Sequence, residues 1–265
     1  MKIVGFNHFQ LDSLDVEKTR VFYESLGGKL AQTMERADGW RGYHVRLAEA
    51  TTIEIQPPRF AELCGGSDGW DHMALRVSDC EAACELIVKA GGTIEKKPSQ
   101  NQMGDRPIIN AVTFGLDGEK IELVQELDQE LPADAPVILG VSHMQLNSLD
   151  VNRSRAFYEA AFDGKVVASI MEKDDPAKEK GYMVEIAPGS ILEIQPPRFP
   201  LTGKNSAWNT IAIETDDIDA ACEKIVAAGG IREVGPMKGS MGTVNILNAV
   251  VIGPDQEHVE LIQII

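Results

Sequence analysis

The chain has 265 residues, of which 43% are hydrophobic, and this is long enough for two domains that each bury a core. Its 41 acidic and 25 basic side chains give a formal net charge of −16, which argues against nucleic acid and anionic membranes as partners. No apolar run approaches the roughly 18–20 residues that cross a bilayer. The first residues lack the charged-then-apolar pattern of a signal peptide, so we expect a cytoplasmic protein.

The first half predicts two modules of the same order, βαβββ. In residues 1–60 we expect a strand over 6–11, a helix over about 15–26 that begins at Ser13 or Asp15, and strands near 29–35, 41–48 and 51–56. In residues 68–126 we expect a strand over 71–77, a helix over 79–90, and strands near 93–97, 108–114 and 119–125. Residues 127–137 are acidic and contain proline, which is typical of a linker.

The second half repeats the first. Residues 53–60 read IEIQPPRF and residues 192–199 read LEIQPPRF. Four shorter matches keep the same order, and they begin at Ser13 and Ser148, Phe22 and Phe157, Ala82 and Ala220, and Asn110 and Asn248. A unit of this length indicates a duplicated domain, so we predict domains at 1–126 and 138–265, the second with modules 138–199 and 206–265. The repeated PPRF segment predicts a structural turn, although Arg59 could also close over an acidic substrate.

Strand alternation places isolated polar side chains opposite an apolar face in each module. Near residue 53, Ile53 and Ile55 form one face and Glu54 belongs to the other. The same reasoning gives His8, His72 and Glu122 corresponding places on first and last strands. A lone strand histidine is usually structural, but the symmetric placement of all four favours one divalent metal ion, whether Ni, Zn, Mn, Co or Fe. The fold class is thus α+β, with four tandem modules forming curved mixed sheets that carry helices on their convex faces.

These motifs resemble the vicinal oxygen chelate superfamily, which includes glyoxalase I, methylmalonyl-CoA epimerase, extradiol dioxygenases and the fosfomycin and bleomycin resistance proteins. The segments that carry the resemblance are His8, RVFYESLG from residue 20, IEI from residue 53, DHMA from residue 71 with VSD from residue 77, and DGEKIEL from residue 117. The resemblance covers the whole chain. Its His/Glu/His/Glu set is most similar to glyoxalase I, and the epimerases come next.

The two copies leave two ligand sets open. The second copy has His143, Glu193 and Glu260 at the corresponding places, but Thr210 stands in the place of His72. If consecutive modules share a site, the complete set is His8, Glu54, His72 and Glu122. If the pairing is crossed, as in glyoxalase I, it is His143, Glu193, His72 and Glu122. The other site lacks one ligand and we expect it to be inert, although His258, two residues before Glu260, could supply a nitrogen.

Such a ligand set implies proton-transfer chemistry. A metal that binds two substrate oxygens stabilises an enediolate, and Glu54 or Glu122 can take and return a proton at carbon. The expected enzyme is a glyoxalase-like lyase, an isomerase or an epimerase acting on a small oxygenated substrate. The alternatives are a ring-cleaving extradiol-type dioxygenase, which uses only one carboxylate, and a metal-free binding or resistance protein, in which the two carboxylates would be costly.

Further residues of the same strand faces are candidate substrate contacts. They are Gln10, His44, Arg46, Gln56 and Arg76. His44 and Arg76 are replaced by Met183 and Glu214 in the second copy, which fits a substrate site in one half and neutral drift equally well. Glyoxalase I typically carries an arginine just after the first ligand, where glutathione's carboxylate binds, and Gln10 stands here instead. We therefore expect a small-molecule partner other than a glutathione adduct, and a homodimer stays open.

Overall fold

The computed structural model describes residues 1–58, 69–171, 175, 178–197 and 207–265. Arg59 and Phe60, and their repeat counterparts at 198–199, lie outside the described residues, so the turn predicted for the PPRF segments is not described. Each module follows the predicted order βαβββ. The elements of the first half are β1 (Ile3–Asp12), α1 (Val16–Ser25), β2 (Lys29–Glu35), β3 (Arg41–Ala48), β4 (Thr51–Gln56), β5 (Trp70–Val77), α2 (Cys80–Lys89), β6 (Thr93–Met103), β7 (Arg106–Phe114) and β8 (Lys120–Glu126). Those of the second half are β9 (Ile138–Asn147), α3 (Val151–Phe162), β10 (Lys165–Met171), β11 (Glu179–Ala187), β12 (Ser190–Gln195), β13 (Trp208–Thr215), α4 (Ile218–Ala227), β14 (Ile231–Met241), β15 (Val244–Ile252) and β16 (His258–Ile264).

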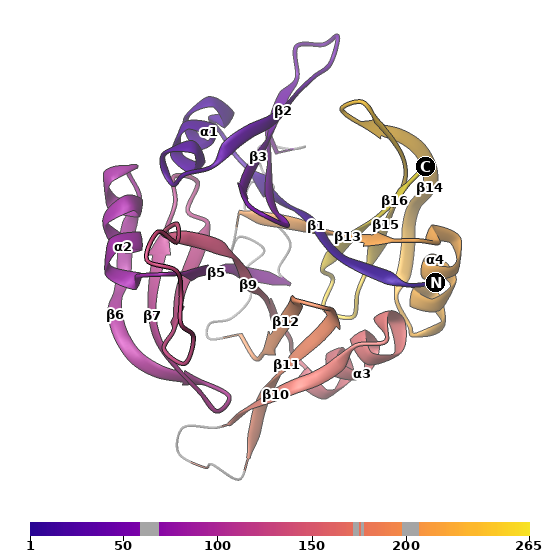
Figure 1. The fold of residues 1–265 in the computed structure, drawn as a ribbon. Coiled ribbons are helices and arrows are strands. Elements are labelled where there is room, and N and C mark those ends of the chain that lie inside the picture. Colours follow the sequence, from indigo (N-terminus) through magenta and orange to yellow (C-terminus); the bar gives the residue numbers. More distant parts are fainter. Residues whose placement is uncertain (59–68, 172–174, 176–177, 198–206) are drawn as a thin grey trace.

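The modules pair in the crossed order and form two curved eight-stranded sheets (Figure 1). Sheet A joins the first and fourth modules in the order β14-β15-β16-β13-β1-β4-β3-β2. Sheet B joins the third and second modules in the order β10-β11-β12-β9-β5-β8-β7-β6. The junctions are antiparallel, β1 with β13 and β5 with β9. The ligand set based on consecutive modules is therefore wrong as a single cluster, because two of its members lie in sheet A and two in sheet B.

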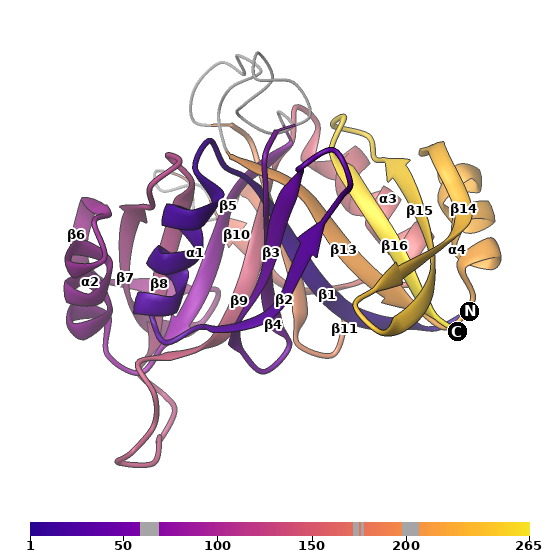
Figure 2. The same ribbon diagram turned by 90° about the horizontal axis from the view of Figure 1, so that it is seen from above.

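The helices lie on the convex faces of the two sheets, and α3 of sheet B contacts α4 of sheet A (Figure 2). Each begins at an aspartate whose carboxylate accepts a backbone N–H of the first turn, and these caps are Asp15, Asp79, Asp150 and Asp217. Of the two residues predicted to start the first helix, Asp15 is the one that caps it. Each helix packs on strands of its own module, and the buried side chains of both sheets form one main core. No helix in the described ranges is long and apolar enough to cross a membrane.

Reciprocal hydrogen bonds hold the two sheets together. The indole N–H of Trp70, on β5, donates to the carbonyl oxygen of His258, on β16, at 2.9 Å. Its counterpart Trp208, on β13, donates to the carbonyl oxygen of Lys120, on β8, at 2.9 Å. Both indoles are fully buried, and each joins a strand of one sheet to a strand of the other. The duplication is thus expressed as a pseudo-symmetric contact between sheets, with a concave face in each sheet, called cup A and cup B below.

A second pair of reciprocal contacts ties α1 and α3 to the module that opens onto the other sheet. Tyr23, on α1, donates to Glu119 at 3.0 Å, and Tyr158, on α3, donates to Glu257 at 2.7 Å. Both glutamates are fully buried. Burial raises the pKa of Glu119 and of Glu257 to about 7, because a charged carboxylate loses its hydration there. A side chain at the facing Gly115 would overlap the carboxylate of Glu119, so that position needs glycine.

Strand β6 is longer than the sequence predicts. The prediction ended it at residue 97, before Pro98, and the strand continues to Met103. Its pairing with β7 shifts register between Lys96 and Ser99, and this irregularity accommodates the proline. The extension carries Asn101, Gln102 and Met103 to the rim of cup B.

Candidate metal centre

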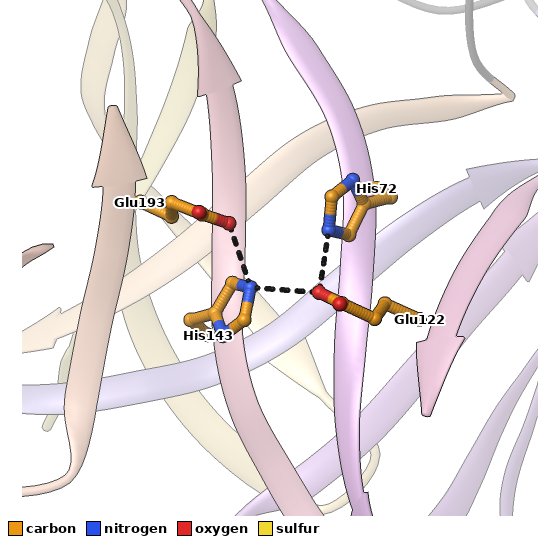
Figure 3. Close-up of side chains that lie close together, drawn as sticks. All are labelled: His72, Glu122, His143 and Glu193. Carbon is orange, nitrogen blue, oxygen red and sulfur yellow. Dashed lines mark hydrogen bonds and ion pairs between the residues drawn. The ribbon is translucent and has the colours of Figure 1, made fainter. Parts of the chain in front are cut away.

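Four strands of sheet B bring two histidines and two glutamates to one point in cup B (Figure 3). His72 comes from β5, Glu122 from β8, His143 from β9 and Glu193 from β12. One ligand atom from each lies within 4.8 Å of the others. Ala74 is paired with His143 on one side and Glu122 on the other, and its small side chain leaves room between them.

The contact distances suit a shared ion. His143 Nε2 lies 2.9 Å from Glu193 Oε2 and 3.3 Å from Glu122 Oε2. His72 Nε2 lies 3.2 Å from the same Glu122 oxygen. Two atoms bound to one metal at about 2.1 Å are roughly 3.0–3.4 Å apart at octahedral or tetrahedral angles. The observed distances of 2.9, 3.2 and 3.3 Å lie within or close to that range.

The unpartnered nitrogen of His143 is a direct sign that a cation fits. His143 is 2% exposed, and its Nε2 has no hydrogen-bond partner among the residues that the structure describes. The two nearby carboxylate oxygens do not lie where a ring N–H would donate well. Burying such a group without a partner costs about 1–3 kcal/mol, and one cation bound by the nitrogen and the carboxylates removes that cost. The residues present therefore fit a divalent metal.

The charges of the cluster balance in pairs. Burial lowers the pKa of His143, but the carboxylates of Glu193 and Glu122 outweigh it and raise the pKa to about 10. Burial raises the pKa of Glu122, while the nearby imidazoles of His143 and His72 hold it well below its usual range. The metal-free cluster thus keeps its carboxylates ionised against protonated imidazoles. A divalent ion with two neutral imidazoles and two carboxylates has the same net charge, so metal can replace the two protons.

Neighbouring polar groups orient each ligand. His72 Nδ1 lies 2.8 Å from Asp71 Oδ2, which also pairs with Lys120 Nζ at 2.8 Å. His143 Nδ1 lies 3.3 Å from Ser142 Oγ. Asn110 Nδ2 donates to Glu122 Oε1 at 2.6 Å. Contacts of this kind fix the ring tautomer, so that Nε2 of each imidazole faces the centre.

A cavity of about 610 Å³ adjoins the cluster, within the usual range for a small-molecule site. All four cluster residues line it. Three lysines also line it, namely Lys96, Lys120 and Lys180, although the chain as a whole is strongly acidic. Gln145 and Gln195 add neutral polar groups, and Asp71 and Glu95 add two carboxylates. A small molecule with an anionic group suits this lining.

The structure distributes the remaining candidate residues differently from the expectation. Three candidate substrate contacts, Gln10, His44 and Gln56, lie on sheet A with His8 and Glu54, and not beside the complete cluster. Their repeat counterparts Gln145, Met183 and Gln195 line the cavity instead. Arg46 is exposed, and Arg76 is half-buried on β5 and is not among the cavity-lining residues. His258 Nε2 lies 3.6 Å from Glu233 Oε2, and His258 is not a member of the cup A cluster of His8, His44 and Glu54.

Sequence reasoning missed Asp71, Asn110 and Gly115. Asn110 carried a signal, because it belongs to a short motif that recurs in the second copy with Asn248. Asn248 makes the equivalent contact in sheet A, where its Nδ2 donates to Glu260 Oε1 at 3.2 Å. Asp71 carried a weaker signal, since its counterpart is Asn209.

The chain matches known proteins in sequence. A family model described as "Glyoxalase/Bleomycin resistance protein/Dioxygenase superfamily" matches residues 5–123 and 140–261. A probable lactoylglutathione lyase of Vibrio cholerae is 35% identical over 133 residues, which are 46% of this chain and 89% of that protein. A probable chloroplastic lactoylglutathione lyase of Arabidopsis thaliana is 29% identical over 181 residues, which are 64% of this chain and 47% of that protein. The chain thus spans about half the length of the Arabidopsis relative.

Solved structures show the same fold. Glyoxalase I from Zea mays superposes with a TM-score of 0.75 at 22% identity, covering 98% of this chain and 92% of that one. A putative dioxygenase from Bacillus subtilis superposes with a TM-score of 0.70 at 13% identity, covering 99% of this chain and 86% of that one. At these identities the likeness establishes the architecture, and the reaction has to be argued from the site.

Proposed function

The chain belongs to the glyoxalase/bleomycin resistance protein/dioxygenase superfamily, and from that premise we propose that it is a divalent-metal-dependent lyase or isomerase. Its substrate is a small oxygenated molecule that reacts through an enediolate. The observation that carries the proposal is the convergence of two imidazoles and two carboxylates beside one cavity. A metal bound by His72, Glu122, His143 and Glu193 would supply Lewis acidity toward a substrate oxygen.

A carboxylate of cup B moves the proton. Glu122 and Glu193 both reach the centre, and each can remove a proton from a carbon next to a carbonyl and return it to the neighbouring carbon. Asn110 fixes Glu122, and Gln195 donates to Glu193 Oε1, so both carboxylates are oriented. Glu54, the other catalytic candidate of the sequence, is the counterpart of Glu193 in cup A. The catalytic pair proposed here is therefore Glu122 and Glu193.

The substrate carries a negative charge in this proposal. The lysines Lys96, Lys120 and Lys180 of cup B are the candidate contacts for its anionic group. Because three relatives are named as lactoylglutathione lyases or probable ones, the adduct of glutathione with an α-oxoaldehyde is the first substrate to test. The strand that carries the first ligand of cup B has Gln145 where an arginine would be typical, so the lysines would have to bind glutathione's carboxylates.

The decisive experiment combines product and isotope analysis. Metal-reconstituted protein is incubated in deuterated water with methylglyoxal and glutathione, and separately with a panel of anionic α-hydroxy carbonyl compounds. We expect thioester formation or deuterium incorporation at substrate carbon, and neither in His72→Thr. The proposal would be overturned if the wild type reacted no faster than His72→Thr with any of these substrates. Oxygen uptake with a catechol would also overturn it.

A further inference from the structure

Cup A contains a second cluster of nitrogen and oxygen ligands, and it includes a histidine from an unexpected strand. His8 Nε2 lies 2.7 Å from Glu54 Oε2, and His44 Nε2 lies 3.5 Å from the same oxygen. Ligand atoms of these three residues all lie within 4.8 Å of one another. We propose that they form a second divalent-metal site, in which His44 supplies the imidazole that is missing because Thr210 stands in the place of His72.

The strand register explains how His44 reaches the site. His44 on β3 is paired directly with Glu54 on β4, so their side chains leave the sheet on the same face. In cup B the equivalent pair is Met183 with Glu193. Cup B therefore has histidine at position 72 and methionine at 183, whereas cup A has threonine at 210 and histidine at 44. Each cup keeps two imidazoles close to the glutamate of its fourth strand.

Both imidazoles of cup A have a buried nitrogen that lies near Glu54 without a well-aligned hydrogen bond. His8 and His44 are 3% and 6% exposed, and their Nε2 atoms accept or donate no hydrogen bond within the described part of the chain. Asn7 Nδ2 donates to Glu214, so its Oδ1 accepts from His8 Nδ1 at 3.0 Å. In the neutral ring, which is the form that binds a metal, that bond leaves the lone pair of His8 on Nε2, facing Glu54. One cation would satisfy both nitrogens together.

A fourth ligand is close by and balances the charge. Glu260 Oε2 lies 3.3 Å from His8 Nε2, outside the three-residue cluster, and would supply the second carboxylate for a divalent ion if its side chain turned toward the centre. Thr210 offers only a neutral hydroxyl, a weaker ligand than imidazole, and this hydroxyl donates to Asn209 Oδ1 at 2.9 Å. Two imidazoles and two carboxylates suit a borderline first-row ion such as Zn²⁺. The inference does not depend on the reaction proposed for cup B.

Metal counting tests this site without an activity assay. The full chain is stripped with a chelator, loaded with excess Zn²⁺, dialysed and analysed for bound metal. We expect two ions per chain in the wild type and one in His44→Met, which introduces the residue that cup B carries at that place. His72→Thr, the reciprocal change in cup B, should also bind one ion, and the double variant none. His258→Ala is the matched control and should keep two.

The outcomes separate the two proposals. One ion per chain in the wild type, unchanged in His44→Met, would overturn the second site while leaving the cup B proposal intact. Loss of the ion in His44→Met with none lost in His72→Thr would support cup A and count against cup B. If His44→Met does not fold, the Co²⁺-loaded wild type decides. Its NMR spectrum should show hyperfine-shifted ring protons from both His8 and His44, and unshifted His44 protons would contradict the site.

Discussion

Cup A and cup B are built from corresponding strands in the same order, yet they differ at the positions that decide their chemistry. Both keep a histidine on the strand that opens each half, two glutamates and an asparagine behind one of them. Cup B adds His72 next to Asp71, whereas cup A has Thr210 next to Asn209. The scaffold and the carboxylates have been retained in both copies, and the second imidazole has not kept its position.

The surroundings of the two clusters differ as much as the clusters themselves. Cup B is lined by Lys96, Lys120 and Lys180. The corresponding positions of cup A hold Val234, His258 and Arg41, and Arg41 pairs with Glu35 at 2.6 Å. Lysine side chains are therefore concentrated beside the cup B cluster, although Lys120 also pairs with Asp71 and Lys96 donates to the neutral Asn110. This difference favours catalysis in cup B and a cation site without substrate in cup A.

The largest effect should come from removing the charge of the catalytic carboxylate in cup B. Glu122→Gln and Glu193→Gln keep an oxygen that can contact a metal but lose the base. We expect kcat to fall by about 10²–10⁴ in the variant that lacks the base. The measurement is kcat on a substrate identified as above, with bound metal counted in parallel. Because each variant replaces an anionic ligand by a neutral one, kcat is measured at saturating metal.

The matched change in cup A sharpens the comparison. Glu54→Gln alters the counterpart of Glu193, and we expect it to reduce kcat less than tenfold. If Glu54→Gln were as damaging as the cup B variants, catalysis could not be assigned to one cup. If neither Glu122→Gln nor Glu193→Gln lowered kcat a hundredfold, proton transfer by these carboxylates would be wrong.

Much of this architecture could be predicted from the sequence because it follows from local rules. Alternation of Ile53, Glu54 and Ile55 gave the strand and the face of the glutamate. The capping preferences left Ser13 and Asp15 as possible starts of the first helix, and Asp15 is the one observed. The four βαβββ modules are confirmed. The extension of β6 past Pro98 was missed, because a polar run that is paired only through an irregular register has no local signature.

The pairing of modules could not be predicted in the same way. Joining β1 to β5 or to β13 uses the same backbone groups and buries the same apolar faces. What distinguishes the two arrangements is a set of long-range contacts, such as the bond from Trp70 to β16. The same limit applies to His44. Its strand face was assigned correctly, but the cup that this face lines depends on the pairing.

A pH-dependent stability difference should follow from the buried glutamates that both halves share. The pKa of Glu119 rises from about 4.5 to about 7 on folding, because burial disfavours its charged form. The stability that Glu119 contributes is fully present below pH 4.5 and is lost as the pH rises toward 7. Above pH 7 the free energy of unfolding no longer changes through this group. The loss is about 3 kcal/mol at 1.36 kcal/mol per unit. Urea unfolding of metal-free protein between pH 4.5 and 8 measures it.

The neutral variant Glu119→Gln isolates this group. It keeps an acceptor for Tyr23 but cannot ionise. The free energy of unfolding of this variant should therefore not show the decrease of about 3 kcal/mol between pH 4.5 and 7. Glu257→Gln should behave alike, since the contact with Tyr158 is equivalent. The exposed Glu85→Gln serves as control and should follow the wild type. Unequal behaviour of the two buried variants would show that the halves are not equivalent even in their shared scaffold.

The smallest effect concerns the groups behind the ligands. Asp71→Asn gives cup B the residue that cup A has at position 209 and weakens the acceptor for His72 Nδ1. Losing such a contact typically lowers metal affinity 10–100-fold. The reciprocal Asn209→Asp has no histidine beside it, because Thr210 stands there, so it should leave the affinity of cup A within a factor of a few. Competition with a chromophoric chelator measures both metal affinities. The cup B change is measured in the His44→Met background and the cup A change in the His72→Thr background, so that each protein has one metal site. An unchanged affinity in Asp71→Asn would mean that the hydrogen bond to His72 does not tune the ligand, and the contrast between the cups would then rest on the imidazoles alone.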